Sequence, residues 1–183
     1  MKNEVMEWVL SIGLAIIFVV AIRTFIFTPV VVDGASMMPT YEDGDKIIVN
    51  KISKQLTDYK RFDVIVFEAK KDTNYIKRVI GLPGEHIVYK DDILYVNGES
   101  YEEPFLEAYK NNLVDGGTLT EDFTLEEYTG EFTIPDDTLF VLGDNRRNSS
   151  DSRDPSVGFV QMDKVLGKAN IRIYPFNHIG IVK

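Results

Sequence analysis

Asp63-Val-Ile-Val-Phe67 and Tyr75-Ile-Lys-Arg-Val-Ile80 are short runs of β-branched and aromatic residues, and runs of this kind recur along most of the chain. Six others have the same character: Pro29–Val32, Asp45–Asn50, His86–Tyr89, Ile93–Val96, Thr138–Leu142 and Ala169–Tyr174. Turn signals separate several of them, among them Asn97-Gly98 and Leu82-Pro-Gly84. Short strands at this spacing predict a mostly β fold, in one main domain that covers residues 28–183.

The run Tyr75–Ile80 carries a lysine in an apolar setting. Strand alternation places Tyr75, Lys77 and Val79 on one face of the strand, with Arg78 on the other. If the lysine face is buried, desolvation lowers the pKa of the Lys77 amine and makes it a usable base. The competing interpretation is an edge-strand lysine whose ammonium group lies in water.

Ser36 lies in the segment Gly34–Thr40 and is the candidate nucleophile. A serine hydroxyl is a poor nucleophile at neutral pH and needs a neighbouring base. The only histidines, His86 and His178, stand in no recognisable triad setting, so a neutral lysine is the candidate base. Taken alone, however, a Gly-Ala-Ser turn is a common surface loop.

A polar loop, Gly143–Asp154, follows the apolar run Leu139–Leu142. By composition it is a surface loop. It could also supply a hydroxyl that holds the lysine amine, together with an Asp–Arg pair that braces the loop.

The twenty residues from Trp8 to Phe27 carry a single charged side chain and could span about 30 Å as a helix. We therefore expect one membrane anchor at residues 8–27, preceded by a short N-terminus of residues 1–7. A cleaved signal peptide is the first alternative, but the segment before the anchor is acidic and no Ala-x-Ala exit follows it. A buried core helix or an interfacial helix is the second. Counting positive charges does not decide the orientation.

Charge and composition exclude several classes of protein. The net charge of −9 argues against nucleic-acid binding through a general basic field. The absence of cysteine excludes disulfides, thiolate catalysis and cysteine-ligated metal. Residues 99–137 carry twelve acidic side chains against one basic, which predicts an acidic insertion or cap between two groups of strands. This lobe is either a solvated excursion or a surface that anionic lipid repels, which would turn the remaining domain towards the bilayer.

In their joint order these segments resemble the type I signal peptidase family, in its compact Gram-positive form. The resemblance covers nearly the whole chain and rests on the anchor and four motifs: Ser36–Thr40, Gly44–Lys51, Tyr75–Glu85 and Gly143–Arg153. It implies a mostly antiparallel β catalytic domain of the type shared with the self-cleaving SOS repressors. It also implies a membrane-bound serine endopeptidase that removes signal peptides with a Ser/Lys dyad and cuts after small residues.

The resemblance also assigns roles to individual residues. Ser36 would be the nucleophile and Lys77 the general base, and the supporting residues would be Ser149, Asp151, Arg153 and Arg78. The pockets for small substrate residues would be lined by Val32, Gly34, Met37, Tyr75 and Ile76. Two positions depart from the family pattern. Some members have a serine at position 34 that helps the oxyanion hole, which leaves only the Ser36 backbone N–H here, and Glu85 replaces a common aspartate.

The implied partners are secretory preproteins and the phospholipid bilayer, with no nucleic acid, no cofactor and no metal, and the expected state is a monomer. The implied location is the cell membrane, with residues 1–7 in the cytoplasm and residues 28–183 outside it. One alternative is a catalytically inactive anchored homologue that scaffolds or regulates secretion, although such a protein would be expected to lose Ser36 or Lys77. Another is a soluble repressor-type autoprotease, but here the hydrophobic segment stands where a DNA-binding module would be.

Overall fold

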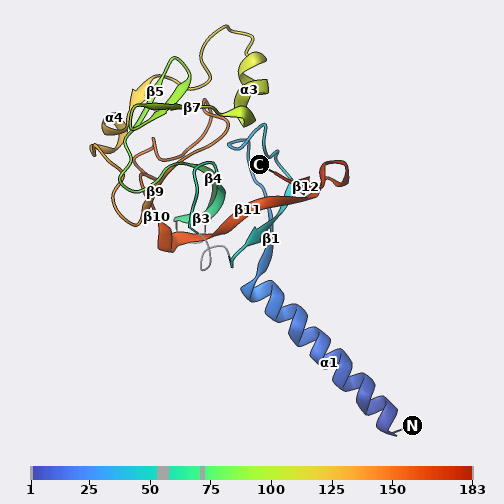
Figure 1. Ribbon diagram of the computed structural model, residues 1–183. Coiled ribbons are helices and arrows are strands. Elements are labelled where there is room, and N and C mark those ends of the chain that lie inside the picture. Colours follow the sequence, from blue (N-terminus) through green and yellow to red (C-terminus); the bar gives the residue numbers. More distant parts are fainter. Residues whose placement is uncertain (1, 53–57, 71–72, 183) are drawn as a thin grey trace.

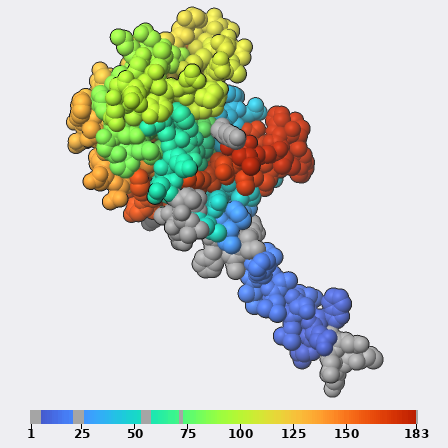
Figure 2. Space-filling view, viewed as in Figure 1, coloured from blue at the N-terminus to red at the C-terminus, as the bar shows by residue number. Residues whose placement is uncertain are grey.

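A computed structural model describes residues 2–52, 58–70 and 73–182 of the chain. It begins with helix α1, Lys2–Phe25, which projects away from a β-rich body (Figure 1). The large apolar side chains described between Met6 and Val20 are 55% to 71% exposed, and the helix stands clear of the body in Figure 2. Within the described residues, no helix combines the length and the apolar character that a membrane span needs.

The helix boundaries differ from the expected anchor limits of 8–27. α1 starts before Trp8 and ends at Phe25, and Phe27 already belongs to strand β1, Phe27–Val31. The reason is backbone pairing, because Phe27 lies opposite Asn50 in an antiparallel ladder. A hydropathy pattern cannot separate the end of an apolar helix from the start of an apolar strand.

The larger sheet has eight strands and holds most of the body. Its order is β1-β2-β11-β3-β4-β9-β10, with β12 paired to β11, and every pairing is antiparallel. Its strands beyond β1 are β2 (Lys46–Asn50), β3 (Val64–Lys70), β4 (Thr73–Gly81), β9 (Thr138–Leu142), β10 (Val160–Gln161), β11 (Val165–Tyr174) and β12 (Gly180–Ile181). The predicted mostly β fold is therefore confirmed.

A smaller sheet lies at the end of the body away from α1 (Figure 1). Its order is β7-β6-β5-β8, from strands β5 (Ile87–Lys90), β6 (Ile93–Val96), β7 (Glu99–Tyr101) and β8 (Phe123–Thr124). Two helices accompany it, α3 (Pro104–Asn111) and α4 (Leu125–Thr129). Two 3-10 turns occur near the C-terminus, η1 (Met162–Lys164) and η2 (Phe176–His178).

The acidic stretch 99–137 supplies β7, α3, β8 and α4 to this smaller unit. The smaller unit begins at β5, before the acidic stretch that starts at residue 99, because β5 and β6 complete its sheet. Tyr89, Leu94 and Phe123 bury its apolar face against Phe140 and Leu142 of β9. The acidic insertion is thus half of a cap that packs on the strand preceding the polar loop.

Candidate active site

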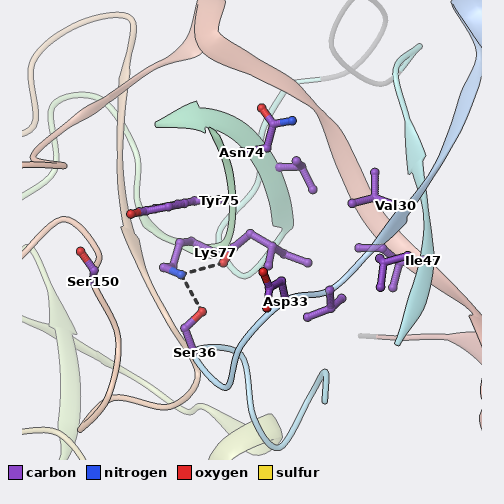
Figure 3. A pocket seen from close by; sticks show the side chains of 12 residues that line it. Val30, Asp33, Ser36, Ile47, Asn74, Tyr75, Lys77 and Ser150 are labelled. Atoms are coloured by element: carbon purple, nitrogen blue, oxygen red, sulfur yellow. Dashed lines mark hydrogen bonds between the residues drawn. The ribbon is translucent and has the colours of Figure 1, made fainter. Parts of the chain in front are cut away.

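Ser36 and Lys77 meet at the junction of two elements. Lys77 lies within β4, and Ser36 lies in the turn that follows β1. Lys77 Nζ is 2.8 Å from Ser36 Oγ, and it also donates to the carbonyl oxygen of Ile76 at 3.0 Å (Figure 3). The hydroxyl and the amine therefore lie within hydrogen-bond distance, 41 residues apart in the sequence.

Lys77 is removed from water, with 3% of its surface exposed. Burial lowers the pKa of its amine to about 8, although the charges of Asp151 and Asp144 oppose the shift. The Tyr75 ring centre lies 5.2 Å from Nζ, on the same side of the strand. About a tenth of the amine is therefore neutral at pH 7 and about half at pH 8, and this neutral form is the general base.

The backbone around Ser36 is held by the polar loop that follows β9. Asn145 donates from its backbone N–H to the Ser36 carbonyl oxygen at 3.1 Å, and from Nδ2 to the Ala35 carbonyl oxygen at 3.1 Å. A Cβ atom at Gly143 would overlap the Ser36 carbonyl oxygen, so only glycine allows this close approach. Sequence reasoning did not single out Asn145, although it lies in the quoted loop.

The polar loop is braced by the pair that the sequence predicts. Asp151 is fully buried and accepts hydrogen bonds from Arg153 Nε at 2.9 Å and Arg153 Nη2 at 2.8 Å. Its Oδ2 also accepts from the Gly143 backbone N–H at 3.0 Å. Because Gly143 contacts the Ser36 backbone, the Asp151–Arg153 pair fixes the surface on which Ser36 rests.

Ser149 does not make the expected hydrogen bond to Lys77. Its Oγ is buried and has no hydrogen-bond partner among the described residues, and it packs against Gly143. Ser150, the next residue, lines the cavity that contains Ser36 and Lys77, and its Oγ donates to Asp154 at 2.7 Å. The order of residues in a loop does not determine which of two adjacent serines faces the site.

Arg78 points away from Lys77 and is fully buried. It forms a two-point ion pair with Asp144, from Nε to Oδ1 at 2.8 Å and from Nη2 to Oδ2 at 2.7 Å. Its Nη1 donates to the Phe62 carbonyl oxygen at 2.9 Å, and its guanidinium lies 3.7 Å from the Phe105 ring centre. Arg78 thereby ties β4 to the polar loop and to helix α3 of the cap.

A second buried arginine connects the cap to the polar loop, and the sequence patterns did not indicate it. Arg146 pairs with Glu103 and donates to Tyr89 Oη at 2.8 Å and to Thr120 Oγ1 at 3.1 Å. Its Nε donates to the Gly143 carbonyl oxygen at 2.9 Å. The cap is therefore bonded directly to the loop that supports Ser36.

A cavity of about 210 Å³ opens beside the two side chains; we call it the Ser36 cavity. Three of the predicted pocket residues, Val32, Tyr75 and Ile76, line it. The other lining residues are Val30, Val31, Asp33, Ile47, Val66, Asn74 and Ser150, besides Ser36 and Lys77 (Figure 3). Its walls are mostly aliphatic, which suits small apolar groups.

Two predicted pocket residues lie outside the lining. Met37 is fully buried in the core with Val32 and Tyr41, because the turn after Ser36 directs its side chain inward. Gly34 has a φ of +89°, and its backbone N–H donates to Asp43 Oδ1 at 2.8 Å. Gly34 therefore shapes the turn and does not line the cavity.

The comparisons with known proteins agree with this geometry. The family described as "Signal peptidase, peptidase S26" matches residues 5–174. Signal peptidase I of Bacillus caldolyticus is 52% identical over 166 residues, which are 91% of this chain and 90% of that protein. Signal peptidase I of Bacillus amyloliquefaciens is 42% identical over 183 residues, 100% of this chain and 95% of that protein.

A solved structure is also similar. The crystal structure of a signal peptidase I from Enterococcus faecalis V583 aligns with a TM-score of 0.57 and 44% sequence identity. The alignment covers 61% of this chain and 97% of that one. This chain therefore belongs to the signal peptidase I family, peptidase family S26, whose members are serine endopeptidases that remove signal peptides.

Proposed function

We propose that Ser36 and Lys77 are the nucleophile and the general base with which this chain removes signal peptides from secreted preproteins. The observation that carries the proposal is the 2.8 Å distance between Ser36 Oγ and a buried lysine amine. Burial lowers the pKa of that amine towards neutral pH, which supplies the base that serine needs. The alternative of an inactive scaffold predicts no turnover, and the intact Ser36–Lys77 pair argues against it.

The reaction begins when neutral Lys77 accepts the Ser36 proton and Oγ bonds to the scissile carbonyl carbon. Lys77 then gives its proton to the departing amine, and the C–N bond breaks to leave an acyl-enzyme. A water molecule that loses a proton to Lys77 attacks the ester, which frees the signal peptide and returns the proton to Ser36. A positioned base of this kind contributes about 10²- to 10⁴-fold to the rate.

The oxyanion that forms during each attack needs backbone donors. Ser36 can offer its own N–H, as the family resemblance implies. The Gly34 N–H is engaged with Asp43 Oδ1 at 2.8 Å, so it supplies no second donor in this arrangement. The aliphatic walls from Val32 and Ile76 favour small residues before the cut, where bulkier side chains would not fit.

We further propose that α1 anchors the enzyme in the cell membrane, with residues 1–7 cytoplasmic and residues 28–183 outside. Trp8–Ile22 carry no charge, and their described apolar side chains are exposed around the helix. The acidic cap lies at the far end of the body from α1, which suits repulsion from anionic lipid (Figure 1). The enzyme would then work on preproteins at the membrane surface, as a monomer.

The test is direct. Purified full-length protein in detergent is incubated with a secretory precursor, and mass spectrometry identifies the new N-terminus. We expect one cleavage after a small residue and no product from Ser36→Ala. Cleavage by Ser36→Ala at the same bond would contradict the assignment of the nucleophile.

A further inference from the structure

Among the described residues that line the Ser36 cavity, Asp33 is the only acidic one. It lies three residues before Ser36, and both side chains line the same cavity, where Figure 3 labels them. Its side chain is exposed and makes no hydrogen bond or ion pair with any described residue. A carboxylate without a partner therefore faces the place where substrate would lie.

The charges around Asp33 leave this position electronegative. Asp43 accepts from the Gly34 backbone, and Asp45 is already paired with Arg172 at 3.2 Å. Lys77 is the only cation among the lining residues that the structure describes, and it is uncharged when it acts as the base. A positive substrate group would find one unneutralised carboxylate here.

We propose that Asp33 is a specificity residue that favours a lysine or arginine side chain close to the scissile bond. The inference rests on the proposed function of Ser36 and Lys77. The proposed preference concerns three substrate positions: the second residue before the cut and the first two residues after it. The first and third residues before the cut are excluded, because they are the small residues that the aliphatic walls hold. The three residues from Asp33 to Ser36 span at most about 10 Å, so the Asp33 carboxylate stays close to the scissile bond and does not reach substrate residues farther along an extended chain.

The expected preference is modest because Asp33 is exposed. Solvent-exposed ion pairs contribute little free energy. We therefore expect kcat/KM for the lysine peptide to exceed that for the glutamine peptide by about two- to fivefold. Glutamate at the same position should be cleaved more slowly than glutamine. The preference should decline as salt is raised from low ionic strength, since exposed charges are screened.

The experiment uses full-length enzyme in detergent and peptides that differ only at one of these three positions. Each set carries lysine, glutamine or glutamate, and the glutamine peptide serves as the neutral reference. We expect wild type to prefer lysine at one position or more, Asp33→Asn to bring the lysine-to-glutamine ratio to about one, and Asp33→Lys to favour glutamate. The matched control Glu99→Gln removes the same charge from β7, outside the cavity, and should keep the wild-type ratio.

The outcomes separate the two proposals. If wild type cleaves no peptide, the proposed function fails. If it cleaves all three peptides equally at every position, or if Asp33→Asn keeps the preference for lysine, the specificity role is overturned while the dyad stands. Melting temperatures of the variants verify that each one is folded.

Discussion

Lys77 and Arg78 are neighbours on β4, and their side chains lie in two buried regions on opposite faces of the strand. The two regions differ in whether they place a carboxylate next to the buried cation. Arg78 meets a carboxylate at two points, a backbone carbonyl and an aromatic ring, so its charge is compensated. Lys77 has a hydroxyl and a carbonyl as hydrogen-bond partners, and no carboxylate lies within ion-pair distance among the described residues. The same strand therefore presents a structural cation on one side and a latent base on the other.

The pKa of the Lys77 amine is therefore set by its local surroundings on β4 and not by a change of fold. Compensation keeps a buried cation charged, whereas desolvation without an adjacent anion favours the neutral form. Asp144 and Asp151 lie near enough to oppose the shift of Lys77, but burial outweighs them.

Lys77→Met should reduce kcat/KM for precursor cleavage by about 10²- to 10⁴-fold, because the base is lost while the cavity stays filled. The measurement is the initial rate of cleavage by purified enzyme. The control is Lys90→Met, which removes an exposed lysine at the end of β5 and should cleave at the wild-type rate. Turnover by Lys77→Met close to wild type would remove Lys77 from the mechanism.

Arg78→Met should destabilise the protein by about 3 to 5 kcal/mol, because Asp144 would remain buried without its partner. Denaturant unfolding of the detergent-solubilised protein measures the change. Adding Asp144→Asn to Arg78→Met should recover part of the loss, since the uncompensated charge disappears. If Arg78→Met alone were as stable as wild type, the Arg78–Asp144 pair would not hold the polar loop.

Lys77→Met should have the opposite effect on stability and raise it by about 1 to 3 kcal/mol at pH 7. The folded protein binds the Lys77 proton with a pKa of about 8, below the ordinary lysine pKa of 10.5, so protonation opposes folding. Wild-type stability should therefore rise between about pH 8 and pH 10.5, and the advantage of Lys77→Met should shrink over that range. A constant difference across those pH values would contradict the depressed pKa.

The pH profile of kcat/KM should rise about tenfold between pH 7 and pH 9. Only the neutral amine accepts the serine proton, and its fraction increases through a pKa of about 8. Initial rates with a peptide that lacks titratable groups near the cut give the profile. A flat curve over this range would exclude an amine with this pKa as the base.

Asn145→Ala should lower kcat about three- to tenfold with little change in KM, because it removes the side-chain hydrogen bond to the Ala35 carbonyl that helps to hold the turn at Ser36, while the backbone hydrogen bond to Ser36 remains. Asn148→Ala, in the exposed part of the same loop, is the matched control. Equal kcat values for the two variants would show that the side-chain contact of Asn145 does not position Ser36.

Local pattern predicted the strands well, because alternation and turn residues act over a few neighbours. It placed Lys77 on an apolar face of β4. The Asp151–Arg153 pair was assigned by the resemblance to the family, and the two side chains form an ion pair in the structure. The local pattern could not predict where the cap begins. β5 and β6 belong to it because β5 pairs with β8 and β6 pairs with β7, and both partners come from the acidic stretch. Sheet partners far apart in the chain leave no periodic signal.

The amino-acid sequence was sufficient to predict the strand content and the apolar N-terminal helix, and its ordered motifs supplied the serine and the lysine of the family. The tertiary structure was needed to place Ser150 in the cavity lining in place of Ser149, to direct Met37 into the core and to bring Asn145 to the turn at Ser36. It also decided that Arg78 is compensated by Asp144, 66 residues away, while Lys77 is not compensated. Such choices depend on which loop packs on which strand, and that packing is fixed by contacts across the whole fold.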